Sequence, residues 1–204
     1  MISPEPATAD AGTGTKAART RRRILEVAAV EFAAHGYGGA SLRRIAAAAG
    51  LQVGSLYFHF RTKDELVASV LADGVDSARA ALEAALERVP PDADAATRLR
   101  AALRGHLDAL HASDVRAAAV VRMVETLPPE LRAAHVTAER RFGLVWSREL
   151  ERGRRDGVVR SDVDARTLRD LLVGALNSTS TTSPAARRDL DTVVETLAAL
   201  LAPR

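Results

Sequence analysis

The chain has 204 residues, of which 47% are apolar and only 3% aromatic, so its core must consist mostly of Ala, Leu and Val, which favours closely packed helices. The absence of cysteine excludes disulfides, thiolate metal sites and cysteine nucleophiles. No apolar run approaches the ~20 residues that span a bilayer, and the first residues lack the pattern of a secretory signal. We therefore expect a cytoplasmic protein without a membrane partner.

Positive charge is concentrated in one quarter of the chain. The formal net charge is +3, but residues 16–63 contain nine Lys and Arg residues against two Glu residues, which leaves +7. A local excess of this size is typical of a surface that binds a polyanion such as nucleic acid. A solvated basic surface without a partner is the alternative that charge alone leaves open.

The first predicted helix follows a leader, residues 1–15, which has no periodicity and is expected to be disordered. From Lys16 onward, Ile24, Ala28 and Phe32 recur on one face at helical spacing. The glycine-rich segment HGYGG is suited to end this helix with a left-handed cap.

Two short helices come next. Ser41 is a suitable N-cap for a second helix, which stops at Gly50. A third helix of about six residues is predicted from Val53 to Phe58. Two short helices joined by a tight turn are typical of a helix-turn-helix, whose second helix enters the major groove of DNA.

The rest of the chain is predicted to be helical as well. Thr62 and Glu65 have the spacing of a capping box, so a long fourth helix is expected to begin there. The segment NSTSTTSP is predicted to end the helix that precedes it, and Ser183 and Pro184 are predicted to start a last helix. The predicted helices after Thr62 cover about 62–88, 95–112, 115–127, 129–156, 164–177 and 183–202. The expected fold class is all-α, with a three-helix DNA-binding domain at 16–63 and a helical ligand-binding and dimerisation domain at 64–204.

Residues on the outer side of the predicted third helix are the candidates for contact with DNA. Its first residues would meet base edges, and its far end would lie against the sugar-phosphate strand. Phe60 is expected to anchor the helix in the core, while Phe58 suits either role. The predicted DNA-binding residues are Arg43, Arg44, Gln52, Val53, Gly54, Ser55, Tyr57, His59 and Lys63.

The segment RRRILEVAAVEFAAHGYGGASLRRIAAAAGLQVGSLYFHFRTKDEL resembles the TetR family of transcriptional regulators. The shared pattern includes Phe-x-x-x-Gly-Tyr, Ile-Ala-x-x-Ala-Gly and Gly-Ser-Leu-Tyr-x-His-Phe. Gln52 stands where this family usually has a Ser that starts the third helix, so that helix is expected to be less well capped. The resemblance implies a DNA-binding regulator whose remaining helices hold a small-molecule pocket and a dimer face.

Two apolar stripes in the C-terminal region predict this dimer face. Two antiparallel helices from each of two subunits would form a four-helix interface. The two DNA-binding domains of such a dimer, about 34–36 Å apart, would then bind the two half-sites of a palindromic DNA sequence. Packing of both stripes within one subunit is the alternative. One stripe comprises Leu168, Leu171, Leu172, Ala175 and Leu176, and the other comprises Leu190, Val193, Val194, Leu197, Leu200 and Leu201. Of these, the predicted interface residues are Leu168, Leu172, Leu176, Leu190, Val194, Leu197 and Leu201.

Bulky side chains are rare in the second domain, so those present are candidates to line a pocket, although core packing is the alternative. The predicted ligand-binding residues are Arg122, Met123, Phe142, Trp146 and Asn177, with His106 and Glu125 as further polar contacts. The region also resembles, more weakly, a TetR subgroup that senses acyl-coenzyme-A thioesters. Such relatives often carry aromatic residues where this chain has Ser178, Thr179 and Thr181. We expect a small apolar or amphipathic effector.

Three functions from different classes are compatible with these features. The first is a dimeric repressor that a small molecule releases from a palindromic operator. The second is a DNA-binding regulator without a small-molecule effector, either partner-controlled or an activator. The third is an enzyme, but the sequence contains no nucleophile motif and no phosphate-binding loop. His106 and His111 are five residues apart, a spacing that does not place both on one helix face as a metal-binding or catalytic pair would require. No cofactor or metal is expected.

Overall fold

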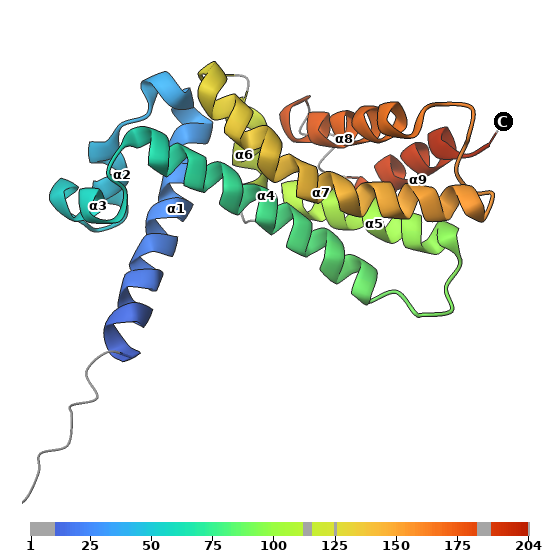
Figure 1. Cartoon of the computed structure of the whole chain (residues 1–204), viewed down its shortest axis with the longest axis horizontal. Helices are drawn as coiled ribbons and strands as arrows, with labels where there is room; N and C mark the ends of the chain where they lie inside the picture. Colours follow the sequence, from blue (N-terminus) through green and yellow to red (C-terminus); the bar gives the residue numbers. More distant parts are fainter. Residues whose placement is uncertain (1–10, 112–115, 125, 183–188, 204) are drawn as a thin grey trace, which may run out of the picture.

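A computed structural model describes residues 11–111, 116–124, 126–182 and 189–203, and the regular elements within these ranges are all helices (Figure 1). The predicted all-α fold class is therefore confirmed. No helix in the described ranges is long and apolar enough to cross a membrane. The helices are α1 (Ala11–Gly39), α2 (Leu42–Ala48), α3 (Val53–His59), α4 (Lys63–Glu87), α5 (Ala95–His111), α6 (Arg116–Val124), α7 (Pro129–Arg155), α8 (Ala165–Thr182) and α9 (Leu190–Leu201).

The helices form a small head and a larger lobe (Figure 1). α1, α2 and α3 make up the head, and α4 runs from the head into the lobe, where it packs against α5 and α7. α6 lies at the junction and packs against α1. One apolar core extends through both parts, with Phe32 and Phe60 fully buried in the head and Leu103 and Trp146 fully buried in the lobe.

The first helix begins earlier than predicted. It starts at Ala11 rather than Lys16, so the last five residues of the predicted leader are helical, while residues 1–10 lie outside the described part of the chain. Once a helix has formed, each added residue costs little, and no proline stands between Ala11 and Lys16 to stop it. Gly36 has φ 64° and ψ 178°, a conformation that suits only glycine, and it kinks the helix at the predicted position.

The predicted N-caps of two helices are present. The Ser41 hydroxyl accepts the N–H of Arg44 at 3.4 Å, and the Thr62 hydroxyl accepts the N–H of Glu65 at 3.0 Å. The Glu65 carboxylate reaches back one residue further than in a standard capping box and accepts the N–H of Arg61 at 2.8 Å. These bonds fix where α2 and α4 begin.

The predicted helix end near residue 177 is wrong, because α8 continues through the first residues of NSTSTTSP to Thr182. The hydroxyls of Ser178, Thr179 and Ser180 each donate to the carbonyl three residues earlier, at 2.7–2.8 Å, so they are satisfied within the helix. The predicted last helix starts at Ser183 and Pro184, which lie outside the described residues. α9 begins at Leu190, and Asp189 caps it by accepting the N–H of Thr192 at 2.9 Å.

Candidate nucleic-acid interface and ligand cavity

The head holds α3 against a scaffold formed by α1 and α2. Gly50 has φ 68°, which lets the chain reverse tightly between α2 and α3, and the guanidinium of Arg23 lies over it. The inner face of α2 and α3 is buried, and Phe60 anchors it as predicted, whereas Leu51 is half-buried and packs against the same core. The buried residues of α2, α3 and their ends are Ile45, Ala46, Ala49, Leu56 and Phe60.

The front of α3 is open to a partner. Gln52, Gly54 and Ser55 are exposed, and Val53 and His59 are half-buried. A Cβ atom on Gly54 would meet nothing within 4 Å, so the backbone there is accessible to a broad surface such as a groove floor. The Gln52 side chain makes no cap hydrogen bond, as the sequence predicts, and is therefore available for a base edge.

Two aromatic side chains of α3 project into solvent. Tyr57 is 47% exposed and Phe58 84%, which makes Phe58 the most exposed large apolar side chain in the described part of the chain. Its ring meets the edge of His59 at a centroid distance of 5.5 Å. The sequence left the role of Phe58 open, and its exposure excludes the core. An exposed aromatic beside the predicted base-contacting residues is suited to contact a thymine methyl or a sugar.

Arg44 fastens α2 to α1. Its Nε donates to the Glu31 carboxylate at 2.7 Å, and its Nη2 donates to the carbonyl of Gly39 at 2.8 Å. The hydrogen bond from Arg44 is the main reason that the pKa of Glu31 lies below its usual value. Arg43, the next residue back, is exposed and makes no hydrogen bond or ion pair with the described residues. A phosphate contact stays a prediction for Arg43 and for Arg44, but only the Arg43 side chain is free of hydrogen bonds and ion pairs with the described residues.

Lys63 is also engaged within the protein. Its ammonium donates to the carbonyl of Ala40 at 2.8 Å and lies 4.9 Å from the ring centroid of Tyr37. The Tyr37 hydroxyl in turn donates to Asp64 at 2.6 Å, and this hydrogen bond raises the pKa of Tyr37. The start of α4 is therefore tied to the end of α1, and the predicted phosphate contact of Lys63 requires its ammonium to turn outward.

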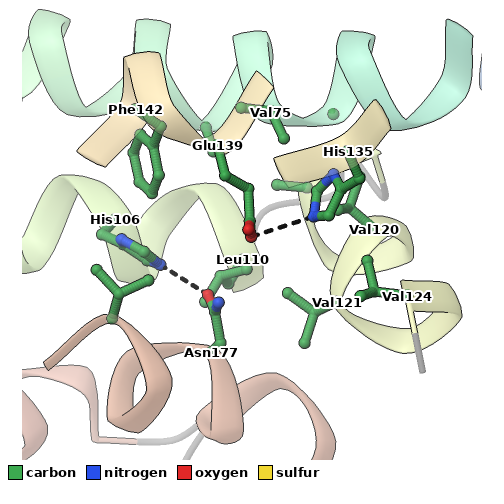
Figure 2. Close-up of a pocket in the computed structure, with 14 residues that line it drawn as sticks. Val75, His106, Leu110, Val120, Val121, Val124, His135, Glu139, Phe142 and Asn177 are labelled. Carbon is green, nitrogen blue, oxygen red and sulfur yellow. Dashed lines mark hydrogen bonds and ion pairs between the residues drawn. The ribbon is translucent and has the colours of Figure 1, made fainter. Parts of the chain in front are cut away.

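The lobe contains a partly open cavity of about 240 Å³ between α4, α5, α6, α7 and α8 (Figure 2). Most of its wall is apolar, and α6 contributes four of the lining residues. Polar groups come from α5, α7 and α8. The apolar lining includes Val75, Ala78, Leu110, Ala117, Val120, Val121, Val124, Phe142 and Val173, and the polar lining includes His106, His135, Glu139 and Asn177.

A buried histidine forms one wall of the cavity. Trp146 Nε1 donates to His106 Nδ1 at 3.3 Å, and because an indole N–H can only donate, His106 Nδ1 must accept. The other ring nitrogen, Nε2, then carries the proton and donates to Asn177 Oδ1 at 3.1 Å. Burial lowers the pKa of His106 to about 4, and the hydrogen bond to Asn177 opposes this shift only partly. His106 is therefore neutral at physiological pH.

A second histidine lies beside a carboxylate. His135 is almost fully buried, and its Nε2 lies 3.1 Å from Glu139 Oε1. Its Nδ1 is buried and has no hydrogen-bond partner among the described residues. The Glu139 side chain is 49% exposed and extends into the cavity (Figure 2).

The predicted ligand residues divide into two groups. Phe142 and Asn177 line the cavity, as predicted, and so does His106. Met123 and Trp146 do not, because both are fully buried in the core, and Arg122 lies on the exposed side of α6. Glu125 lies outside the described residues. The sequence prediction missed His135 and Glu139, although their spacing of four residues places both on one helix face with Phe142 nearby.

The predicted dimer stripes are directed into their own subunit. Five of the seven predicted residues are buried, because α8 packs against α5 and α7 and α9 packs against α5. Ion pairs from Arg100 to Glu195, at 2.8 Å, and from Arg104 to Asp191 hold α9 in this orientation. Two further residues of the predicted stripes, Leu171, at 65%, and Leu200, at 64%, are exposed on the other side of these helices. The buried residues are Leu168, Leu172, Leu176, Val194 and Leu201, whereas Leu190 and Leu197 are half-buried.

Head and cavity meet at the end of α6. The Thr126 hydroxyl donates to the carbonyl of Met123 at 2.8 Å and accepts the N–H of Tyr37 at 3.5 Å. A Cβ atom on Gly36 would lie 3.4 Å from the same hydroxyl. The helix that lines the cavity with four residues therefore ends against the kink of α1.

These features define a DNA-binding protein with a helix-turn-helix head and a separate helical lobe that contains a cavity. A family profile described as "Bacterial regulatory proteins, tetR family" matches residues 24–70, and one described as "Tetracyclin repressor-like, C-terminal domain" matches residues 92–181. The HTH-type transcriptional repressor KstR2 of Rhodococcus jostii (strain RHA1) is 32% identical over 174 residues, which cover 83% of this chain and 82% of that protein. The chain therefore belongs to the TetR family.

Solved structures agree with this assignment. A tetR-family regulatory protein from Rhodococcus RHA1 is 25% identical with a TM-score of 0.75, covering 90% of this chain and 97% of that chain. AibR, solved in complex with isovaleryl coenzyme A and operator DNA, is 22% identical with a TM-score of 0.74, covering 89% of this chain and 97% of its own. The chain is thus a DNA-binding transcriptional regulator, and the prediction that it is not an enzyme is confirmed by this class.

Proposed function

We propose that this protein is a homodimeric cytoplasmic repressor that binds a palindromic operator and leaves it when a small molecule fills the lobe cavity. The observation that carries this proposal is the short distance in sequence between the cavity-lining residues of α6 and a residue that bonds to the head. Val120, Val121 and Val124 line the cavity, and Thr126, two residues beyond the last of them, bonds to Tyr37 in the head. A ligand that displaces α6 acts directly on the end of α1.

The required energy is modest. A ligand shifts the protein away from the DNA-bound arrangement only by its difference in affinity for the two arrangements. A coupling of about 1–3 kcal/mol changes operator affinity by about 5–150-fold. α4 is a second connection between the cavity and the head. At its start, Lys63 and Asp64 are hydrogen-bonded to residues of the head. Further along, Gly74, Val75 and Ala78 line the cavity.

The dimer is expected to use the outer faces of α8 and α9. Leu171 and Leu200 are the large apolar side chains that these helices leave exposed, and exposed apolar residues on neighbouring helices favour an interface. Two subunits related by a two-fold axis would bring both faces together and hold two heads over consecutive major grooves. This proposal keeps Leu171 and Leu200 of the predicted stripes, which a partner can reach, and gives up the stripe residues that are buried in the subunit.

Relatives support the same function. KstR2 is named a repressor, and AibR was solved with both an acyl-coenzyme-A ligand and operator DNA. The alternative, a regulator without an effector, would be favoured by a filled lobe. The open cavity therefore weighs against this alternative.

The proposal is tested with fluorescent DNA from the protein's own promoter. Fluorescence anisotropy measures the operator affinity, and a panel of small molecules is then added at saturating concentration. We expect at least one compound that fits the cavity to weaken operator binding at least fivefold. Val121→Trp, which fills the cavity from α6, should abolish this response without loss of DNA binding. Binding of DNA that no cavity ligand ever changes would reject the effector and favour the alternative.

A further inference from the structure

The lobe cavity carries a negative charge. Among the described residues that line it, Glu139 has the only fully charged side chain, and none is Lys or Arg. Figure 2 shows this carboxylate in the space between the His106–Asn177 pair on one side and His135 on the other. A carboxylate in such a position attracts a cation and repels an anion.

His135 is the neighbour of this carboxylate. Its Nε2 lies 3.1 Å from Glu139 Oε1, and its buried Nδ1 has no partner in the described part of the chain. The other carboxylate oxygen, Oε2, makes no hydrogen bond or ion pair with the described residues. Because no Lys or Arg lines the cavity, a ligand can supply the cation that this oxygen lacks.

The remaining polar groups of the cavity are mostly engaged. Both ring nitrogens of His106 are used, one by Trp146 and one by Asn177, and the Asn177 oxygen accepts from His106. Asn177 keeps its amide N–H groups. A ligand therefore meets mainly acceptors, the Glu139 oxygens above all. Groups that donate hydrogen bonds match this lining better than a carboxylate or a thioester carbonyl, which only accept.

We propose that the effector is a small amphipathic amine whose ammonium group binds Glu139, an inference that rests on the proposed release of the protein from DNA by a ligand. Its hydrocarbon part packs against Val120, Val121 and Val124 of α6, and its charge lies near the ring of Phe142, which stabilises a cation further. The volume of about 240 Å³ is below the about 300–1,000 Å³ of ordinary ligand pockets, so the amine has a short chain or a single ring.

Loss of water from Glu139 makes the cavity selective. The Glu139 side chain is about half exposed to solvent, and a hydrocarbon that enters the cavity removes solvent from it. A carboxylate that loses water without gaining a cation is strongly destabilised. An ammonium group replaces the water with a charge-assisted hydrogen bond, whereas an alcohol replaces it with a weaker neutral one. An acid of the same chain length adds a second negative charge.

Isothermal titration calorimetry of the full chain with hexylamine, hexanol and hexanoate tests the proposal. We expect hexylamine to bind about tenfold more tightly than hexanol, since a charged hydrogen bond is about 1.4 kcal/mol stronger than a neutral one, and hexanoate not to bind. Glu139→Gln keeps the shape of the side chain and should bring the amine to the affinity of the alcohol. Glu151→Gln, an exposed glutamate of α7 outside the cavity lining, should keep the tenfold preference. Equal binding of amine and alcohol, or a preference that survives Glu139→Gln, overturns the proposal.

Operator release, measured in the same samples, separates this inference from the proposed function. Hexylamine that binds with the expected preference but leaves operator affinity unchanged would reject the ligand response and keep the amine site. Hexanol or hexanoate that binds more tightly than the amine and weakens operator binding would reject the amine and keep the ligand response.

Discussion

The Thr126 hydroxyl accepts the backbone N–H of Tyr37 at 3.5 Å, and this bond joins the last turn of the cavity wall to the DNA-binding head. The two residues are far apart in the sequence and meet because α6 packs along α1. The contact is possible only because Gly36, beside Tyr37, turns the chain with φ 64° and ψ 178°. A glycine in a conformation that other residues adopt only under strain, at the junction between two functional parts, is a suitable place for a two-state element.

The first prediction concerns this glycine. Gly36→Ala should lower the free energy of unfolding by about 1–3 kcal/mol, because a residue with a side chain is strained at this φ and ψ. Gly38→Ala is the matched control, since no atom lies within 4 Å of its added Cβ, and it should be neutral or stabilising by up to about 1 kcal/mol. Urea unfolding of both variants gives the comparison. Equal effects of the two substitutions would show that the backbone conformation at residue 36 does not require glycine.

The second prediction concerns pH. Because the pKa of His106 is about 4 in the folded protein and 6.5 ordinarily, the unfolded state binds more protons between these values. The stability that the neutral ring contributes is therefore complete above pH 6.5 and is lost as the pH falls toward 4. Between about pH 7 and about pH 4 the loss should reach about 3 kcal/mol.

His106→Gln is the control for this effect. Glutamine can still accept from Trp146 and donate to Asn177 but does not titrate. The difference in unfolding free energy between the original protein and His106→Gln should shrink by about 3 kcal/mol over the same pH range. Parallel curves for the two proteins would contradict the assignment, whatever the other titrating groups contribute.

The head was predictable from sequence because its signals are local. Ser41 and Thr62 cap helices within three residues of themselves, and Gly36 and Gly50 stand where the chain needs positive φ. Apolar spacing identified the buried face of α1. What local signals did not reveal is that Arg44 and Lys63 bond within the head, since both look like free surface cations in the sequence.

The lobe was less predictable because its packing partners are distant in the chain. Leu171 and Leu172 are neighbours in sequence, but one is exposed and the other buried, and only the position of α5 and α7 decides which. Phe142 and Trp146 share a face, but Trp146 lies behind His106 and does not reach the cavity. Glu139, in an arginine-rich helix, has the pattern of an outer surface, although it borders the cavity.

A third prediction tests the dimer face. Leu171→Glu combined with Leu200→Glu should convert the dimer to a folded monomer, because both side chains are about two-thirds exposed in the subunit and their loss disturbs no core. Analytical ultracentrifugation measures the mass, and circular dichroism confirms the helix content. Val30→Glu, at a similarly exposed residue of α1, should remain dimeric. A double variant that stays dimeric would place the interface elsewhere.

Phe58 and Phe60 provide a fourth, paired prediction. Phe58→Ala should leave the unfolding free energy within about 0.5 kcal/mol of the original, as expected for an exposed site, and weaken operator binding by about 1–3 kcal/mol through lost apolar contact. Phe60→Ala should destabilise the protein by about 3–5 kcal/mol, because Phe60 is fully buried. Thermal unfolding and fluorescence anisotropy separate the two effects. Unchanged operator affinity in Phe58→Ala would remove this residue from the interface.

The last prediction separates two neighbouring arginines by the salt dependence of DNA binding. Arg43 is exposed and uncommitted, so Arg43→Ala should lower the slope of log affinity against log salt concentration by about 0.9, the value for one lost phosphate contact. Arg44 is held by Glu31 and Gly39, so Arg44→Ala should leave the slope unchanged and reduce the stability of the head. A random-sequence duplex suffices, because phosphate contacts do not depend on sequence. A lower slope in Arg44→Ala would mean that Arg44 exchanges Glu31 for a phosphate when DNA binds.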